Sequence, residues 1–238
     1  MKNIFKVIAL SLTIMIMSGC SAYCDVKMNY DGAVTEKIDV VNSNDKLKYG
    51  NKDIQYSLDL YLKKYDTALK LGGYDTESHV GKKESGVTIS RDYDNICKFI
   101  QNTIFSQYVY KKFECNENDD DYEINSVGEA IRNTDKYDAW LSPDSIVLKM
   151  TFPFSLSEQN ADKISGNTYI WKFNSKTDKS KNVYFKISKE SLLKSKLEHE
   201  AYLKRQRLIK IAFAVLGIVV LVSMTLFVSS KLRNNKYE

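Results

Sequence analysis

Two apolar stretches, one near each end, constrain this chain more than any other feature. Residues 211–228 read IAFAVLGIVVLVSMTLFV and include no charged side chain. As a helix this stretch would be about 27 Å long, close to the thickness of the hydrocarbon core of a bilayer. The basic octet KLRNNKYE follows it, which favours a stop-transfer segment over a buried core helix. We therefore predict a transmembrane helix over residues 208–230 and a cytoplasmic tail over residues 231–238.

The N-terminal stretch predicts export and lipidation. It reads MKNIFKVIALSLTIMIMSGC, with Lys2 and Lys6 before an apolar run, and this order is typical of a secretory signal. The closing residues MSGC resemble the bacterial lipobox, in which two small residues precede the cysteine that receives diacylglycerol. We therefore predict a lipoprotein signal peptide over residues 1–19 and lipidation, palmitate included, at Cys20. An uncleaved signal anchor is the alternative, and it would also leave the following segment outside the membrane.

The formal net charge of +5 is located beside the apolar ends. Residues 20–207 carry 29 basic and 29 acidic side chains and are formally neutral. Nonspecific binding to a phosphate backbone requires a net basic face, so we expect no nucleic acid partner. Basic residues flank residues 211–228 on both sides, so the export signal sets the orientation. We expect a protein of the cell membrane, lipid-anchored at Cys20 and single-pass, with its main domain extracytoplasmic.

Three cysteines remain when Cys20 is used for lipidation. Cys24 falls on the inward face of a predicted strand, which favours a buried free thiol over a redox role. Cys97 and Cys115 could form a disulfide, and the sequence alone leaves that pairing open. No C-x-x-C spacing indicates a metal site.

No other set of side chains in the sequence indicates catalysis, a cofactor or a metal. His79 and His199 are the only histidines, and neither has a neighbour in the sequence that would make it a catalytic base. The acidic run 119–121 lacks the glycine turn and the distal glutamate of an EF-hand calcium loop. Neither a phosphate loop nor an exported Ser/His/Asp set is recognisable. We expect a protein that is not an enzyme, with no catalytic residues, cofactor or bound metal.

Residues 20–187 are predicted to alternate between strands and helices. Apolar alternation on both sides of Asp31-Gly32 predicts an opening β-hairpin, with Glu36 on the same face as its apolar neighbours. Helical spacing predicts one helix capped by Asn51 and ending at Gly72-Gly73, and a second from Asp94. The remaining strands are predicted around residues 74–79, 87–92, 107–114, 146–152, 169–173 and 183–187.

The rest of the segment is expected to connect these elements. We predict a solvated acidic loop over residues 116–123 and a short helix around residues 127–132. Pro153 is expected to restrict its strand to a sheet edge or to end it. Several antiparallel strands with about two helices make an α+β domain. From residue 188 the pattern becomes helical, and a juxtamembrane helix over residues 188–207 is predicted to continue into the span.

The order of these features resembles the LppM-type family of bacterial lipoprotein domains. The resemblance is carried by YCDVKMNYDGAVTEKIDV, by GYDTESHVGKKESGVTISRDYDNI and by ADKISGNTYIWKFNSKTDKSKNVYFKI. It implies an extracytoplasmic domain over residues 20–187 that is suited to binding lipid or glycolipid. It implies no site residues, because the family has no site motif to match.

The topology and the lack of catalytic motifs together favour one function class. We expect a noncatalytic binding module for an envelope lipid, glycolipid or protein, placed at the membrane lipid bilayer. The alternative is a structural or assembly partner of another membrane protein, bound through the transmembrane helix. An enzyme whose carboxylates or tyrosines cluster only in space is the third possibility.

Overall fold

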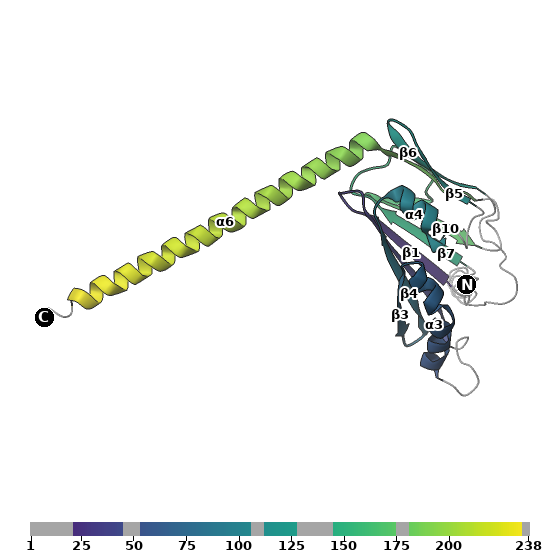
Figure 1. Ribbon diagram of the computed structural model, residues 1–238, viewed down its shortest axis with the longest axis horizontal. Helices are drawn as coiled ribbons and strands as arrows, with labels where there is room; N and C mark the ends of the chain where they lie inside the picture. The colour runs from purple at the N-terminus through teal and green to yellow at the C-terminus, as the bar shows by residue number, and fades with distance from the viewer. Residues whose placement is uncertain (1–20, 45–52, 106–111, 128–144, 175–180, 235–238) are drawn as a thin grey trace, which may run out of the picture. The chain divides into compact units, whose positions relative to one another are not determined.

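The structure of this chain is a computed structural model. It describes residues 21–44, 53–105, 112–127, 145–174 and 181–234. The chain forms two units, residues 1–192 and residues 193–238, and each is described by itself. The first unit is a domain of two β-sheets and short helices, and the second continues a long C-terminal helix (Figure 1). The predicted α+β class with mostly antiparallel strands is confirmed.

The larger sheet has, in the described residues, seven strands in the order β3-β4-β2-β1-β7-β10-β9. The bounds are β1 Ser21–Met28, β2 Val34–Ser43, β3 Asp75–Val80, β4 Glu84–Tyr93, β7 Ser145–Thr151, β9 Lys163–Ser165 and β10 Thr168–Asn174. β1 is a middle strand, antiparallel to β2 and parallel to β7, and the other neighbours pair antiparallel. Pro153 follows the end of β7, which is an inner strand, so this proline marks a strand end and not a sheet edge.

The smaller sheet has the strand order β5-β6-β11-β8. Its strands are β5 Lys112–Glu117, β6 Asp121–Val127, β8 Glu158–Gln159 and β11 Tyr184–Ser188. The prediction of an acidic loop over residues 116–123 is wrong, because most of these residues belong to the β5–β6 hairpin. The side-chain Oδ1 of Asn118 accepts hydrogen bonds from the backbone N–H groups of Asp120 and Asp121, at 3.0 and 2.7 Å. Glu117 is exposed although its backbone is paired with that of Tyr122, so charge alone predicted a loop incorrectly.

One short segment connects the two sheets. β8 pairs with β11 of the smaller sheet, and β9, four residues later in the chain, pairs with β10 of the larger sheet. Strands that change sheets in this way form the corners of packed β-sheets. The sequence predicts neither β8 nor β9, since two or three residues are too few for an alternating pattern to be recognised.

Helix α3 spans Ile54–Leu71 and packs on β3. The backbone N–H of Tyr56 donates to Oδ1 of Asp53 at 2.8 Å, so Asp53 caps its first turn. The predicted cap, Asn51, lies outside the described residues. The helix ends as predicted at the glycine pair, since Gly73 has a positive φ of 77° and its N–H donates to the carbonyl of Lys70 at 2.9 Å.

Helix α4 spans Ile96–Asn102 and lies over β2 and β4. Its N-cap is Asn95, whose side chain accepts a hydrogen bond from the N–H of Lys98 at 2.9 Å. The helix therefore starts slightly later than the predicted start at Asp94. The predicted helix around residues 127–132 falls outside the described part of the chain, except for Val127, which ends β6.

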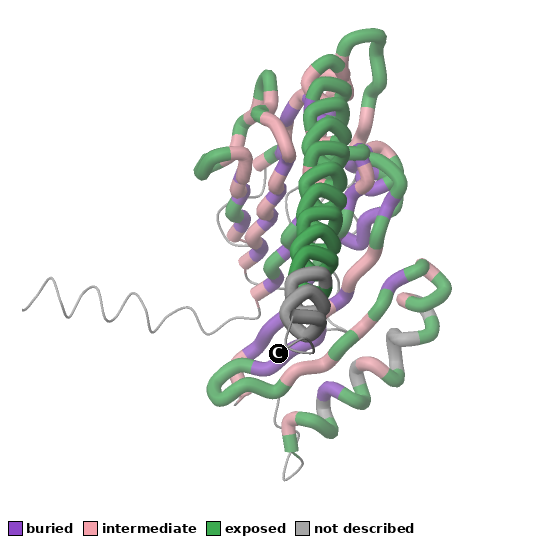
Figure 2. The backbone as a smooth tube through the Cα atoms, turned by 90° about the vertical axis from the view of Figure 1, so that its left-hand side faces the viewer, coloured by how far each residue is buried: buried purple, intermediate pink, exposed green. Residues whose placement is uncertain are grey.

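The core lies on the inner face of the larger sheet. Buried and exposed positions alternate along the strands, as Figure 2 shows. Larger buried side chains come from the larger sheet (Cys24, Met28, Ile89, Leu148, Met150, Trp171, Phe173), from the helices (Leu58, Ile96, Phe99, Ile100) and from the smaller sheet (Ile124, Phe185, Ile187). The alternation predicted for these strands is therefore confirmed.

Candidate functional site

The long C-terminal helix is the element best suited to enter a membrane. α6 spans Lys189–Asn234 without a break, as the sequence predicts. Within its described part, Lys189–Thr225 is long and apolar enough to cross a bilayer, and none of its apolar window is buried. Phe213, for example, is 70 % exposed. A core helix of a soluble domain would be mostly buried, so this exposure favours a transmembrane helix.

The predicted lipidation residue directly precedes, in the sequence, a middle strand of the larger sheet. Cys20 and the signal residues 1–19 are outside the described part of the chain. Ser21 is the first residue of β1, where it pairs with Val41 of β2 and with Ser145 of β7. A lipid on Cys20 would therefore be attached to the residue that directly precedes this strand, with no linker between lipid and sheet.

A disulfide joins Cys97 to Cys115, which answers the question that the sequence leaves open. Cys97 lies in α4, over the larger sheet, and Cys115 lies in β5 of the smaller sheet. The bond therefore connects the two layers of the domain. Disulfides form and persist in oxidising compartments and are rare in the cytosol, so this bond fits an exported domain.

A carboxylate is buried in the core. Glu36 on β2 has no exposed surface. The hydroxyl of Tyr93 donates to its Oε2 at 2.6 Å, and the hydroxyl of Thr103 donates to its Oε1. The thiol Sγ of Cys24 lies 3.9 Å from the same Oε1. Groups from β4, from the end of α4 and from β1 thus hold one carboxylate.

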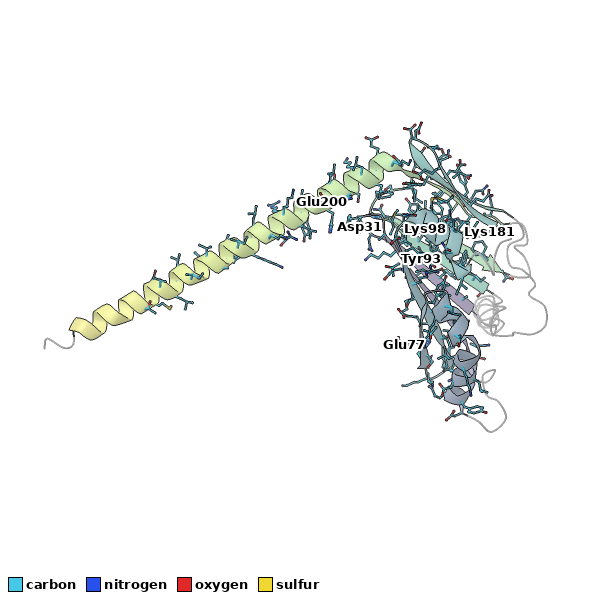
Figure 3. The ribbon with its side chains drawn as sticks, viewed as in Figure 1. Asp31, Glu77, Tyr93, Lys98, Lys181 and Glu200 are labelled. Carbon is cyan, nitrogen blue, oxygen red and sulfur yellow. A yellow bond between two sulfur atoms is a disulfide. The ribbon has the colours of Figure 1, made fainter. Side chains whose placement is uncertain are left out.

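Tyr74 and Arg91 extend this buried cluster. The hydroxyl of Tyr74 lies 2.9 Å from that of Tyr93. It also donates to the carbonyl of Asn102 and accepts from the N–H of Ile104, each at 2.9 Å. The guanidinium of Arg91 lies 5.2 and 4.7 Å from the ring centroids of Tyr74 and Tyr93, within the range of a cation–π contact. Figure 3 labels Tyr93 inside the domain.

Burial determines the protonation of these groups. Burial raises the pKa of Glu36, although hydrogen bonds from Thr103 and Tyr93 oppose that shift. Burial and then the nearby Glu36 carboxylate raise the pKa of the Cys24 thiol well above its usual value. Because the thiolate is the nucleophile, a thiol kept protonated reacts poorly. The prediction of a buried free thiol at Cys24 is confirmed. The hydrogen bonds of this cluster stabilise the packing of β1, β2, β4 and α4.

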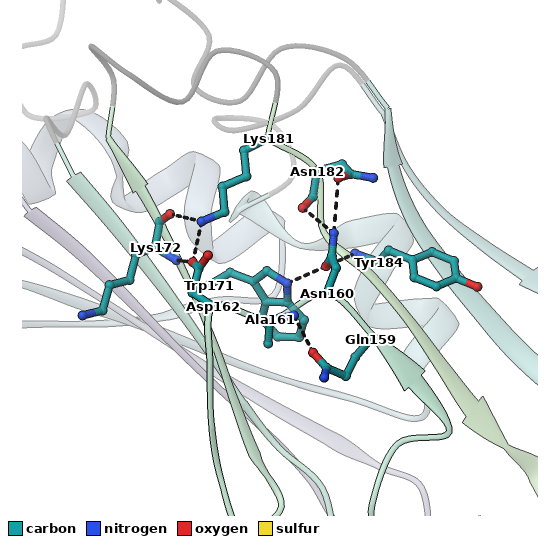
Figure 4. A network of polar contacts seen from close by, with 9 residues as sticks. All are labelled: Gln159, Asn160, Ala161, Asp162, Trp171, Lys172, Lys181, Asn182 and Tyr184. Carbon is teal, nitrogen blue, oxygen red and sulfur yellow. Dashed lines mark hydrogen bonds and ion pairs between the residues drawn. The ribbon is translucent and has the colours of Figure 1, made fainter.

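A second polar network connects the two sheets (Figure 4). The side-chain oxygen of Asn160 accepts from the indole N–H of Trp171 at 2.8 Å and from the backbone N–H of Tyr184 at 2.9 Å. Its amide nitrogen donates to the backbone and side-chain oxygens of Asn182, at 3.1 and 3.2 Å. Trp171 is in the larger sheet and Tyr184 is in the smaller one. A single side-chain amide therefore accepts hydrogen bonds from donors of both sheets.

Asp162 continues this network at the surface. Its Oδ2 accepts from the backbone N–H of Lys172 at 2.7 Å and pairs with the ammonium of Lys181. Lys181 also donates to the carbonyl of Lys172 at 2.7 Å. Burial alone would raise the pKa of Asp162, but the hydrogen bonds from Lys181 and Lys172 outweigh it and hold the pKa below its usual value. This network is therefore an ion pair supported by hydrogen bonds, located where the chain passes from one sheet to the other.

His79 lies near an acidic side chain of another strand. In the folded domain the Nε2 of His79 lies 3.8 Å from Oδ1 of Asp39. Sheet pairing brings β3 and β2 within two strands of each other, which no local sequence pattern shows. Both side chains are partly exposed, so the pair is weak. In the described ranges, no three His, Cys, Asp or Glu side chains are placed to hold a metal ion.

Comparisons with known proteins give one weak structural similarity. No family model matches the sequence, and no curated protein matches it. The chain is similar to the NMR structure of the folded domain of LppM from Mycobacterium tuberculosis, with a TM-score of 0.47 and 11 % sequence identity. The similarity covers 71 % of this chain and 89 % of that one. At this level it assigns neither a family nor an activity to the chain.

Proposed function

We propose that this chain is a membrane-anchored bacterial surface lipoprotein whose α+β domain is a noncatalytic binding module for an envelope lipid, glycolipid or protein. Lipid on Cys20 and the helix over residues 208–230 hold the two ends in the cytoplasmic membrane. The domain over residues 20–187 lies outside, and residues 231–238 lie inside.

One observation supports this proposal most. A disulfide-bonded domain and an exposed apolar helix occur in the same chain. The disulfide favours an oxidising compartment, and the helix has the length that a bilayer requires. A domain in the reducing cytosol would rarely keep a disulfide, whereas an exported and membrane-held domain uses both features.

The arrangement of polar groups favours binding over catalysis. The two polar clusters around Glu36 and Asn160 use their hydrogen-bonding atoms within the domain. The outward face of β1 instead displays Tyr23, which is 48 % exposed, together with Asp25 and Lys27. Tyrosine is enriched at protein contact surfaces, and here it is exposed. We therefore place the ligand on a surface of the domain, and the ligand class includes no nucleic acid.

Metabolic labelling with a fatty-acid analogue tests the anchor. The full chain expressed in a bacterium with a lipoprotein pathway should incorporate the label. Cys20→Ala should abolish incorporation, and Cys24→Ser, the matched control four residues away, should retain it. Label on the Cys20→Ala chain, or no label on the native chain, would overturn the proposed anchor.

Replacing the transmembrane helix distinguishes a binding module in the domain from an assembly role of the helix. The full chain in nanodiscs is offered envelope lipids and glycolipids, and in cells it is crosslinked. Binding that persists when residues 208–230 are replaced by an unrelated apolar span supports a module in the domain. A single crosslinked membrane protein that is lost with this exchange would instead support the assembly role.

A further inference from the structure

We propose that the turn between β3 and β4, residues 81–84, docks on the bilayer that holds the Cys20 lipid, with Lys82 and Lys83 binding anionic phospholipid headgroups. This docking turn goes beyond the proposed function, because it assigns a face of the domain to the membrane. It rests on the proposed lipidation of Cys20.

The strand register places the docking turn at the lipidated end of the sheet. Ser21 is level with Val41, and β2 continues past that point to Ser43, which pairs with Glu84 at the start of β4. Residues 81–83 of the turn lie beyond this pair. At about 3.4 Å per residue, the turn extends about 10 Å past Ser21, on the side from which the chain arrives from Cys20.

The lateral distance is also short. Only β2 separates β1 from β4 in the sheet. Neighbouring strands are about 4.8 Å apart, so the docking turn is displaced sideways from β1 by about 10 Å. A lipid on Cys20 inserts its acyl chains directly beside the first residue of β1. The headgroup layer is therefore within reach of any long side chain on this turn.

Asn44 holds the docking turn in one conformation. Its backbone N–H donates to the carbonyl of Lys83 at 2.9 Å, and its side-chain amide donates to the carbonyl of Gly81 at 3.0 Å. The hydroxyl of Ser85 donates to its Oδ1 at 2.7 Å. A Cβ on Gly81 would lie 2.4 Å from the carbonyl oxygen of Glu84, so only glycine fits there. The two lysines are thus presented from a fixed backbone.

Charge and exposure at the two ends of the sheet agree with this orientation. Lys82 and Lys83 are exposed, and Val80 beside them is 52 % exposed. Glu84 offsets one of the two positive charges. The opposite end of the sheet has exposed acidic residues in its turns, Asp31 after β1 and Asp94 after β4. Lys27 and Lys98 balance these two acidic charges, whereas residues 82–84 sum to +1, so among these residues the docking turn is the end that an anionic bilayer attracts. Figure 3 labels Asp31 at this opposite end.

Fluorescence quenching by lipid tests the docking turn. The full-length lipidated chain is reconstituted in vesicles of phosphatidylglycerol and phosphatidylcholine that include a headgroup spin-labelled lipid. A fluorophore is attached at Glu84→Cys or, as the matched control, at Asp31→Cys, because both are exposed acidic turn residues at opposite ends of β1. Strong quenching at position 84 and little at position 31 is expected. Equal quenching at both positions, or stronger quenching at position 31, overturns the proposal.

Removal of the lysine charges then tests whether the turn binds anionic headgroups or is merely close to the bilayer. Lys82→Gln/Lys83→Gln should lower the docked-to-undocked ratio by about fivefold per lysine. Lys27→Gln/Lys98→Gln removes the same charge at the other end of the sheet and should leave the ratio unchanged. Phosphatidylcholine alone should reproduce the effect of the first variant. If the quenching at position 84 is the same in the native chain, in Lys82→Gln/Lys83→Gln and in phosphatidylcholine alone, the proposed contact with anionic headgroups is wrong.

The two proposals fail in different ways. Mass spectrometry of the N-terminal peptide reports whether Cys20 is acylated in the same preparation. An acylated chain without quenching at position 84 overturns the docking turn and leaves the lipoprotein assignment intact. A chain without acyl groups overturns the lipoprotein assignment and the docking proposal with it.

Discussion

The hydroxyl of Tyr93 donates a 2.6 Å hydrogen bond to Oε2 of Glu36, a carboxylate with no exposed surface. The two residues are 57 positions apart and lie on neighbouring strands. A hydrogen bond to a charged group contributes about 1.5 to 3 kcal/mol to stability. The bond between these two side chains is therefore one of the contacts that fixes β2 against β4.

Glu36→Gln is expected to flatten the pH dependence of stability. The folded-state pKa of Glu36 is raised by burial. Its contribution to stability is therefore fully present below the ordinary glutamate pKa and is lost as pH rises through the raised value. Glutamine does not titrate, so the variant should not show this decline. Urea unfolding of the full chain in detergent, from acid to neutral pH, measures the free energy of unfolding at each pH. Glu77→Gln is the control at an exposed position. An unchanged pH slope in Glu36→Gln would contradict the assignment.

Loss of the disulfide is expected to destabilise the domain by about 3 kcal/mol. Cys97 and Cys115 are 18 residues apart, and cross-links that close loops of this length stabilise by about that amount. Cys97→Ser and Cys115→Ser should lose the same amount, and each should match the reduced native chain. A reduced native chain as stable as the oxidised one would show that the bond contributes nothing.

Asn160→Ala is expected to cost about 1 to 3 kcal/mol for each buried donor that it leaves unpaired. The buried donor is the indole N–H of Trp171, and the backbone N–H of Tyr184, at an exposed contact, also loses its acceptor. Asn167→Ala is the control, because its side chain accepts from Ser155 at an exposed site and should change stability by less than about 0.5 kcal/mol. Equal effects of the two substitutions would mean that Asn160 does not join the sheets.

The Cys24 thiol is expected to resist alkylation in the folded domain. It is 1 % exposed, and its pKa is raised by burial and by Glu36. A maleimide should label it only after unfolding, at a rate that follows the unfolding equilibrium. The control is the same chain in denaturant, where labelling should be rapid. Fast labelling under native conditions would show that the strand β1 opens locally.

Local patterns predicted the strands whose apolar side chains alternate. The hairpin around Gly32, the strand that contains Leu148 and the strand that contains Trp171 are each half buried, so their two faces differ in polarity. The same alternation placed Glu36 on the inward face. Its burial was a signal available from the sequence, but its partners come from distant strands and from the end of α4.

Features that depend on distant contacts were not predictable. The parallel pairing of β1 with β7 joins Ser21 to Ser145, 124 residues away. The β5–β6 hairpin is mostly acidic between Asn116 and Glu123, and this charge obscured the alternation of Phe113 with Cys115 and of Tyr122 with Ile124. The bridge through Asn160 depends on β8 and β9, which are too short to recognise. The cluster around Glu36 and the docking turn both required the strand register.

Protease protection tests the central claim, that the domain is held outside the membrane by its two ends, most directly. Spheroplasts that carry the native chain with a tag after Glu238 are treated with protease without lysis. The account predicts that residues 21–187 are digested after disulfide reduction, while a small tagged fragment containing the span is protected. An intact domain in sealed spheroplasts, digested only after lysis, would contradict it.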